Sequence, residues 1–256
     1  MDPGVRTPLV DFFRRGEVAR DVRLLAARGA LAPRVLEQVA LLLILQDDTD
    51  PEVAARARET IDILPHDPLA AFLGRSEVPG EIRAWFADRG ITPLPGSEPS
   101  DEPLVDVSDP GDDAETADER TLLQRLTTMS VMEKMKVAMR GTREARAMLI
   151  RDPNRLVAAA VLSSPKLTEN EVESFARMAN VTEEVLRVIG TNRAWVKSYT
   201  ITANLVRNPK TPIALSLHLL NRLSDRDVKM LTSDRNVPEP LRVAARKRAV
   251  DSERRR

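Results

Sequence analysis

The chain has no cysteine, and only 3% of its 256 residues are aromatic. The missing cysteine excludes disulfides, thiol nucleophiles and cysteine-based metal sites. The scarcity of aromatic residues argues against aromatic-lined ligand pockets and β-sandwich cores, because the apolar residues are chiefly Leu, Ala, Val, Ile and Met, which fill the seams between helices. Since 42% of the residues are apolar, a real core can form. We therefore expect an all-α protein.

Groups suited to acid–base catalysis are also scarce. The two histidines, His66 and His218, are far apart in the sequence, and we expect His218 to be a partly buried structural residue within an apolar helix. No phosphate-binding loop, dinucleotide fingerprint, zinc-protease motif or nucleophile elbow is present. Carboxylate pairs such as Glu183-Glu184 lie at predicted helix starts, where they complement the helix dipole. We predict a protein that is not an enzyme, with no catalytic residue, cofactor or metal.

The chain also lacks signals for export or membrane insertion. Its start, Met1 to Arg6, has neither the basic nor the apolar region of a secretory signal. The longest apolar run, residues 39–45, is far shorter than the roughly 20 residues that a membrane span requires. We expect this run to be a buried helix, and we expect a cytoplasmic protein without a membrane span.

Charge is balanced overall but strongly segregated along the chain. Lys and Arg against Asp and Glu number 12 against 15 in residues 1–90, none against 10 in 91–119, and 27 against 14 in 120–256. Residues 91–119 are also rich in proline, which predicts a disordered acidic linker. We thus expect an N-terminal helical domain (1–90), this linker, a basic C-terminal helical-repeat domain (120–250) and a frayed tail (251–256). The linker could itself dock onto the basic half, because it is held nearby at high effective concentration.

Helix-start signals recur every 28 residues in the second half of the chain, at Asp152, Asn180, Asn208 and Asn236. In each, a side-chain oxygen could cap the first turn of the helix that follows. The residues five before, five after and nine after each signal are apolar throughout: Ala147, Phe175, Ala203, Leu231, Val157, Val185, Ile213, Leu241, Val161, Ile189, Leu217 and Ala245. A fixed period with a fixed apolar register predicts stacked helix pairs, that is, an α-solenoid of short helical repeats.

Two segments carry a resemblance to known repeat families. Asp50-Pro51-Glu52-Val53 and the alanine-rich stripe after it resemble the second helix of a HEAT repeat, with Asp50 as the N-cap. Asn208-Pro209-Lys210-Thr211-Pro212 resembles the Asn-Pro-x-Thr-Pro turn of the leucine-rich repeat variants. Residues 129–248 as a whole are similar to an uncharacterised bacterial family of helical-repeat proteins. These resemblances imply a HEAT-like fold and no particular activity.

One local cluster combines aromatic and basic side chains. Trp195 and Tyr199 are four residues apart, as are Arg193 and Lys197, so we expect each pair to share a helix face beside Asn192. The cluster could bind a phosphate, a base or a peptide. Alternatively, the two aromatic residues fill the seam between repeats.

Basic residues beside the repeat turns form a second candidate surface: Arg151, Arg207, Lys210 and Arg235. In parallel stacking they would line one edge and could meet an anionic ligand, although cations at helix ends also simply complement the dipole. We expect a scaffold or adaptor that binds a protein or acidic peptide along its repeat surface. The alternative is binding of nucleic-acid phosphates by the basic half, by analogy with HEAT-like DNA glycosylases.

Overall fold

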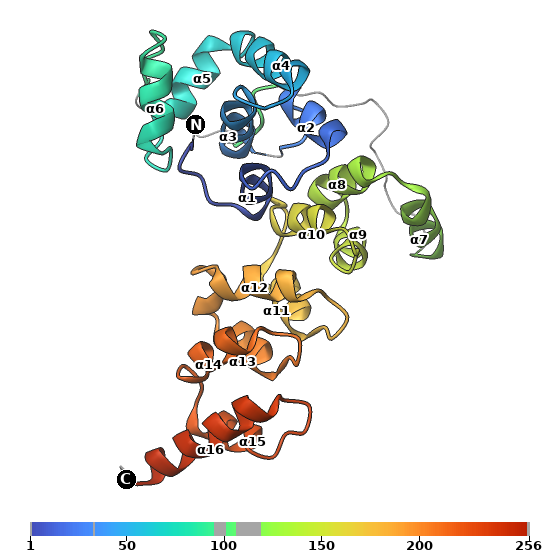
Figure 1. Ribbon diagram of the computed structural model, residues 1–256, viewed down its shortest axis with the longest axis vertical. Coiled ribbons are helices and arrows are strands. Elements are labelled where there is room, and N and C mark those ends of the chain that lie inside the picture. The colour runs from blue at the N-terminus through green and yellow to red at the C-terminus, as the bar shows by residue number, and fades with distance from the viewer. Residues whose placement is uncertain (1, 33, 95–100, 106–118, 255–256) are drawn as a thin grey trace. The chain divides into compact units, whose positions relative to one another are not determined.

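The structure, a computed structural model, describes residues 2–32, 34–94, 101–105 and 119–254, and all regular secondary structure in these ranges is helical (Figure 1). The prediction of an all-α protein is thereby confirmed for the part described. Residues 95–100 and 106–118 of the predicted linker lie outside the described residues, as do the last two residues of the predicted tail. The rest of that tail is not frayed, because the final helix continues to Arg254.

The chain divides into two compact units. Unit 1 comprises Met1–Thr142 with Ala160–Pro165, and unit 2 comprises Arg143–Ala159 with Lys166–Arg256. Within the described residues, no helix has both the length and the apolar character needed to cross a membrane.

Unit 1 is built around one almost wholly buried helix. Its helices are α1 (Pro8–Arg14), α2 (Arg20–Ala27), α3 (Val35–Leu45), α4 (Pro51–Asp62), α5 (His66–Leu73), α6 (Gly80–Ala87), α7 (Glu119–Thr128) and α8 (Val131–Arg140). Helices α1, α2 and α4 all pack against α3. Apart from Glu37 and Gln38, α3 consists of apolar residues that point in all directions, so burying them requires neighbours on every side. The predicted buried helix at residues 39–45 is therefore confirmed.

The start of α4 follows the predicted chemistry. Asp50 is its N-cap, with one carboxylate oxygen accepting from the amides of Glu52 and Val53 at 3.0 and 3.3 Å. Pro51 occupies the first helical position, where its missing N–H would have had no partner. Arg20 of α2 donates to the same Asp50 carboxylate at 2.6 Å, so the cap also ties two helices together.

Unit 2 consists of helix pairs that follow one another along the chain (Figure 1). The helices are α9 (Arg143–Leu149), α10 (Arg155–Leu162, which ends in unit 1), α11 (Glu169–Arg177), α12 (Glu183–Thr191), the short 3-10 helix η1 (Trp195–Lys197), α13 (Tyr199–Arg207), α14 (Ile213–Leu220), α15 (Asp225–Leu231) and α16 (Glu239–Arg254). Helix α11 packs against both α9 and α13, and α16 packs against both α14 and α15.

The four predicted start signals do not share one role. The N-cap of α12 is Thr182 and not Asn180, and the N-cap of α14 is Pro212 and not Asn208. Asn208 instead ends α13 and is buried, whereas Asn180 and Asn236 are exposed. Asp152 accepts from the amide of Asn154 before α10 begins at Arg155, and α16 begins at Glu239, three residues after Asn236. The prediction that each of the four residues caps the following helix is thus wrong. The turns recur every 28 residues in the sequence, but the helix that follows does not always begin at the same position after its signal. Helix α14 begins two residues later than α10, α12 and α16 do.

This shift changes which side chains α14 buries. Of the twelve apolar positions in the repeat register, all are buried except Ala147, Ile213 and Leu217. Ile213 is the first residue of α14, whereas its counterparts are the third residues of α10, α12 and α16. Thr211 precedes a proline, which disfavours a helical conformation and delays the helix start. A delay of two residues turns the register by about 200° at 3.6 residues per turn. Ile213 and Leu217 consequently face outward.

Candidate functional site

The predicted aromatic cluster does not lie on one helix. Trp195 belongs to η1 and Tyr199 begins α13, with extended backbone at Ser198 between them. A separate turn precedes η1, where Asn192 ends α12 and its side-chain oxygen accepts from the amide of Ala194 at 2.9 Å. The prediction that Trp195 and Tyr199 share a helix face is therefore wrong. Arg193 lies in the turn before η1 and Lys197 is the last residue of η1, so these two also do not share an α-helix face; both are exposed.

Tyr199 takes part in a polar network that joins α13 to α15. Its hydroxyl donates to the carboxylate of Asp227 and accepts from the amide of Ser224 at 3.1 Å. Arg207 donates to the other oxygen of Asp227 at 2.5 Å. Chiefly through the hydrogen bond from Tyr199, and with help from Ser224 and Arg207, the pKa of Asp227 is held below its usual range. Tyr199 remains 45% exposed, so it covers the seam at the surface and does not fill the core.

Asn208 and Lys210 bind backbone carbonyls of the preceding helix pair. The Asn208 amide donates to the carbonyl oxygens of Ala176 and Met178, both at 2.9 Å. Lys210 donates to the carbonyl of Val181 at 3.3 Å. These bonds satisfy acceptors at the end of α11 and in the turn after it, which would otherwise lack a helical partner. Residues 208–212, which resemble a repeat turn, thus connect successive helix pairs through hydrogen bonds.

The basic residues of the second candidate surface are therefore partly paired within unit 2. Arg207 is paired with Asp227, and Lys210 is bound to a carbonyl. Arg151 and Arg235 are exposed, as are Arg193 and Lys197 of the former cluster. The charge available to an anionic ligand is smaller than the composition of residues 120–256 suggests.

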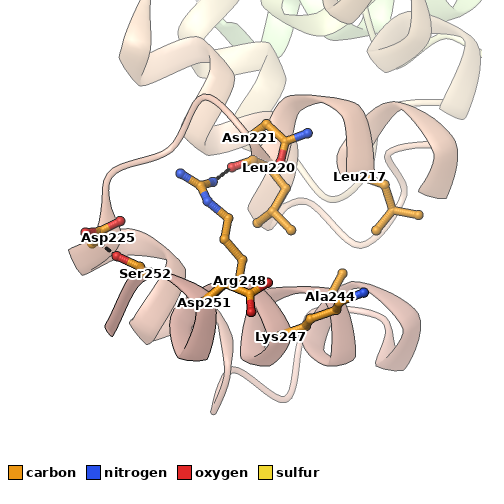
Figure 2. Close-up of a pocket in the computed structure, with 9 residues that line it drawn as sticks. All are labelled: Leu217, Leu220, Asn221, Asp225, Ala244, Lys247, Arg248, Asp251 and Ser252. Atoms are coloured by element: carbon orange, nitrogen blue, oxygen red, sulfur yellow. Dashed lines mark hydrogen bonds between the residues drawn. The ribbon is translucent and has the colours of Figure 1, made fainter. Parts of the chain in front are cut away.

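Two grooves of unit 2 meet the exposed side of α14. The first, of about 620 Å³, lies between α14 and α16, with Leu217, Leu220 and Ala244 on its sides and Lys247 and Asp251 at its rim (Figure 2). Arg248 reaches across it from α16 and binds the carbonyl oxygens at the end of α14 and beyond, including that of Leu223 at 2.6 Å. The sequence pattern did not predict this groove, because its open wall results from the altered register of α14.

The second groove, of about 660 Å³, lies where the turns before α12 and α14 come together. It is lined by residues 181–183 and 209–214 together with Pro238. Ile213 belongs to this groove and Leu217 to the first, and the two side chains are one helical turn apart. They are 39% and 36% exposed. The face of α14 therefore links the two grooves with aliphatic surface.

His218 lies on the same helix and is exposed, contrary to the prediction that it is partly buried. The reason is again the register of α14, whose buried residues are Ser216, Leu219 and Leu220. In the part of the chain that the structure describes, no group of three or more His, Asp or Glu side chains is placed to hold a metal ion.

Comparison with known proteins places no constraint on this surface. No protein-family model, no curated protein and no solved structure matches the chain.

Proposed function

We propose that unit 2 is an α-solenoid of short helical repeats, and that the exposed face of α14 binds an amphipathic helix of a partner protein. In this proposal the protein is a non-enzymatic scaffold or adaptor. Helical repeats suit such a role, because stacking leaves extended grooves whose residues can change without loss of the core.

The way in which successive helix pairs are joined supports the solenoid. The carboxylate at the third position of α11, Glu171, binds Arg146 of α9, and the equivalent carboxylate of α15, Asp227, binds Arg207 of α13. In both cases an acid that accepts from the hydroxyl of its own helix's N-cap residue, Thr168 or Ser224, also holds a cation from an earlier helix. The cations come from different positions of their helices, but contacts between neighbouring helix pairs are what a repeat protein requires.

The exposure of Ile213 and Leu217 is the observation that carries the proposed binding role. Two aliphatic side chains one turn apart form an apolar stripe, and a groove opens at each of them. Apolar surface rimmed by polar residues is typical of an interaction site. An amphipathic helix presents aliphatic residues at the same spacing and can lay them into a groove between two helices. Asn221, Lys247 and Asp251 at the rim offer it polar partners.

The structure offers less support for nucleic-acid binding. Such binding depends on many free Lys and Arg side chains that neutralise phosphates. Arg207, Lys210 and Arg248 are each engaged with acceptors of unit 2. We therefore argue for a protein partner and treat nucleic acid as an outcome of the test.

The test compares two double variants of the full chain by capture from lysate with and without nuclease treatment, followed by titration of each captured protein in purified form. Ile213→Ser with Leu217→Ser removes the stripe. Val243→Ser with Val250→Ser is the matched control, because these residues of α16 are as exposed but do not line the groove. Losing the burial of two aliphatic side chains, about 1 to 2 kcal/mol each, should weaken binding roughly 30-fold to 700-fold.

The control variant should bind as the wild type does, and both variants should keep the wild-type melting temperature. Partners that bind the Ile213→Ser, Leu217→Ser variant with unchanged affinity would overturn the proposal. Capture that vanishes after nuclease treatment, combined with a steep loss of affinity for duplex or single strands on adding salt, would establish the nucleic-acid alternative in its place.

A further inference from the structure

A short segment of unit 1, residues 101–105, lies against α3 in the manner of a bound peptide. The side chain of Gln38 donates to the carbonyl of Val105 at 2.9 Å and accepts from the amides of Leu104 and Val105 at 2.7 and 3.2 Å. Gln38 is only 1% exposed. One buried amide side chain thus pairs with both backbone groups of Val105, as a neighbouring β-strand would.

The acidic end of this segment is held by charge. The amide of Val35 donates to the carbonyl of Asp101 at 3.3 Å. The Asp101 carboxylate lies 3.5 Å from the guanidinium of Arg34 and 3.4 Å from that of Arg75. The two arginines come from either side of the groove, since Arg34 precedes α3 and Arg75 follows α5. This arrangement selects an acid at the first position.

The groove is shaped for close approach of a backbone. Gly29 has a φ of +80°, and a Cβ built at this residue would lie 3.2 Å from the Gln38 amide nitrogen and 3.3 Å from Val105. The carbonyl of Gly29 accepts the second hydrogen bond of that nitrogen, at 2.8 Å. A glycine here therefore orients Gln38 and leaves room for the segment.

The segment is attached to the groove but does not fill it. Pro103, Leu104 and Val105 are all only half-buried. A space of about 330 Å³ remains between residues 102–104 and the wall formed by Val35, Pro65, Pro68 and Phe72. Core segments are packed without such voids. Polar contacts to backbone combined with loose apolar packing are what an exchangeable ligand would show.

We propose that the groove between α3 and α5 is a recognition site for extended peptides with an acidic residue followed, after one residue, by Pro, Leu and an aliphatic residue. Residues 101–105 are its tethered ligand, and a partner protein that carries such a segment displaces them. The site is in unit 1 and is independent of the function proposed for unit 2. The two arginines require an acidic residue and Gln38 requires an extended backbone, while the Pro and Leu of the motif are those of the tethered segment, whose Pro103 and Leu104 line the open space.

The tether determines how the site must be tested. A ligand in the same chain competes at an effective concentration on the order of millimolar, so a free peptide binds the wild-type groove poorly. We therefore replace residues 101–105 of the full chain by Gly-Ser-Gly-Ser-Gly. The probe is a fluorescent peptide with the sequence of residues 99–107, Pro-Ser-Asp-Glu-Pro-Leu-Val-Asp-Val. Binding is followed by fluorescence anisotropy.

Saturable binding to the replaced chain is expected, with at least tenfold weaker binding to the wild type. Adding Gln38→Leu to the replaced chain should weaken binding at least tenfold. Gln46→Leu is the matched control, because Gln46 is a buried glutamine at the other end of α3 whose side chain bonds to the carbonyl of Leu43 and, among the contacts described, to no atom of residues 101–105. A scrambled peptide should not bind. A replaced chain that is folded by circular dichroism but does not bind the peptide would refute the proposal.

If the replaced chain does not fold, a milder variant can still test whether a free peptide displaces residues 101–105. Leu104→Ala in the full chain weakens the tethered ligand through one half-buried side chain. Adding the wild-type peptide at millimolar concentration should then raise hydrogen exchange at the amides of residues 104 and 105. Unchanged exchange would mean that the segment is a fixed part of unit 1 and would overturn the proposal.

Discussion

Arg146 of α9 holds Glu171 of α11 through two hydrogen bonds, at 2.9 and 3.1 Å, and both side chains are almost wholly buried. Burial by itself would raise the pKa of Glu171, but the hydrogen bonds from Arg146 and Thr168 hold it below its usual range. Glu171 also completes a capping box with Thr168 at the start of α11. One carboxylate therefore begins a helix and joins it to its neighbour.

Breaking this pair from one side should be costly. Arg146→Met leaves Glu171 buried without its cation, and we expect the free energy of unfolding to fall by about 3 to 5 kcal/mol. Adding Glu171→Gln removes the uncompensated charge and keeps an acceptor for the capping box, so it should recover a large part of the loss. Urea denaturation of the single and the double variant measures both the loss of stability and its recovery. Arg187→Met, which breaks an exposed pair with Glu183, is the control and should cost less than about 1 kcal/mol.

The turn residues should differ sharply in their contributions. Asn208→Ala removes two hydrogen bonds to buried carbonyls of the preceding pair, so we expect a loss of about 2 to 3 kcal/mol. Asn180→Ala and Asn236→Ala alter exposed side chains and should change stability by less than about 0.5 kcal/mol. Thermal denaturation of the three variants measures these differences in stability. Equal losses at all three sites would show that the turns are equivalent after all.

Helices α12 and α14 approach each other closely at Gly190. We therefore expect an alanine at this position to lower the stability of the fold, although alanine has the higher helix propensity. A Cβ at Gly190 would lie 2.4 Å from a methyl carbon of Leu215. Gly190→Ala should therefore destabilise by about 1 to 3 kcal/mol, although alanine is intrinsically the better helix former by about 1 kcal/mol. Combining it with Leu215→Ala should show a favourable coupling in a double-mutant cycle. Additive losses would mean that the two helices do not touch at this point.

A buried carboxyl in unit 1 predicts a pH-dependent stability. Glu37 of α3 is 3% exposed, and burial raises its pKa from an ordinary 4.5 to about 7, despite a hydrogen bond with Thr7 and the nearby Arg34. Between these two pKa values the folded chain keeps a proton that the unfolded chain has lost, so stability falls as the pH rises. Above pH 7 the loss is complete, at roughly 3 kcal/mol.

Glu37→Gln should remove this dependence. Relative to the wild type, the variant should gain about 2 to 3 kcal/mol at pH 8 and nothing near pH 4, as measured by urea denaturation at the two pH values. Asp101→Asn is informative as a second variant, because the charge of Asp101 contributes to raising the pKa of Glu37. It should move the midpoint of the pH dependence to lower pH. A gain for Glu37→Gln that is the same at both pH values would contradict the assignment.

The local features of this fold could be predicted from the sequence because neighbouring residues produce them. Asp50 and Pro51 begin α4 through contacts within one helical turn. The apolar run at 39–45 indicated a buried helix through its composition alone. The 28-residue period indicated helix pairs, since its apolar positions recur at helical spacing.

The candidate site could be predicted only in part. The outward turn of Ile213 and Leu217 depends on where α14 begins, and the sequence pattern treated all four repeats as equal. The cations were counted correctly, but their availability depends on partners about 20 or more residues away, such as Asp227 for Arg207 and Val181 for Lys210.

The sequence by itself determined that this protein is helical, where several helices begin, and that its second half repeats. These properties arise from hydrogen bonds and side-chain contacts within a few residues. Only the tertiary structure decided which apolar residues stay exposed on α14, which charges are paired, and that residues 101–105 bind Gln38. Each of these depends on groups distant in sequence, whose meeting is fixed by packing and not by local preference.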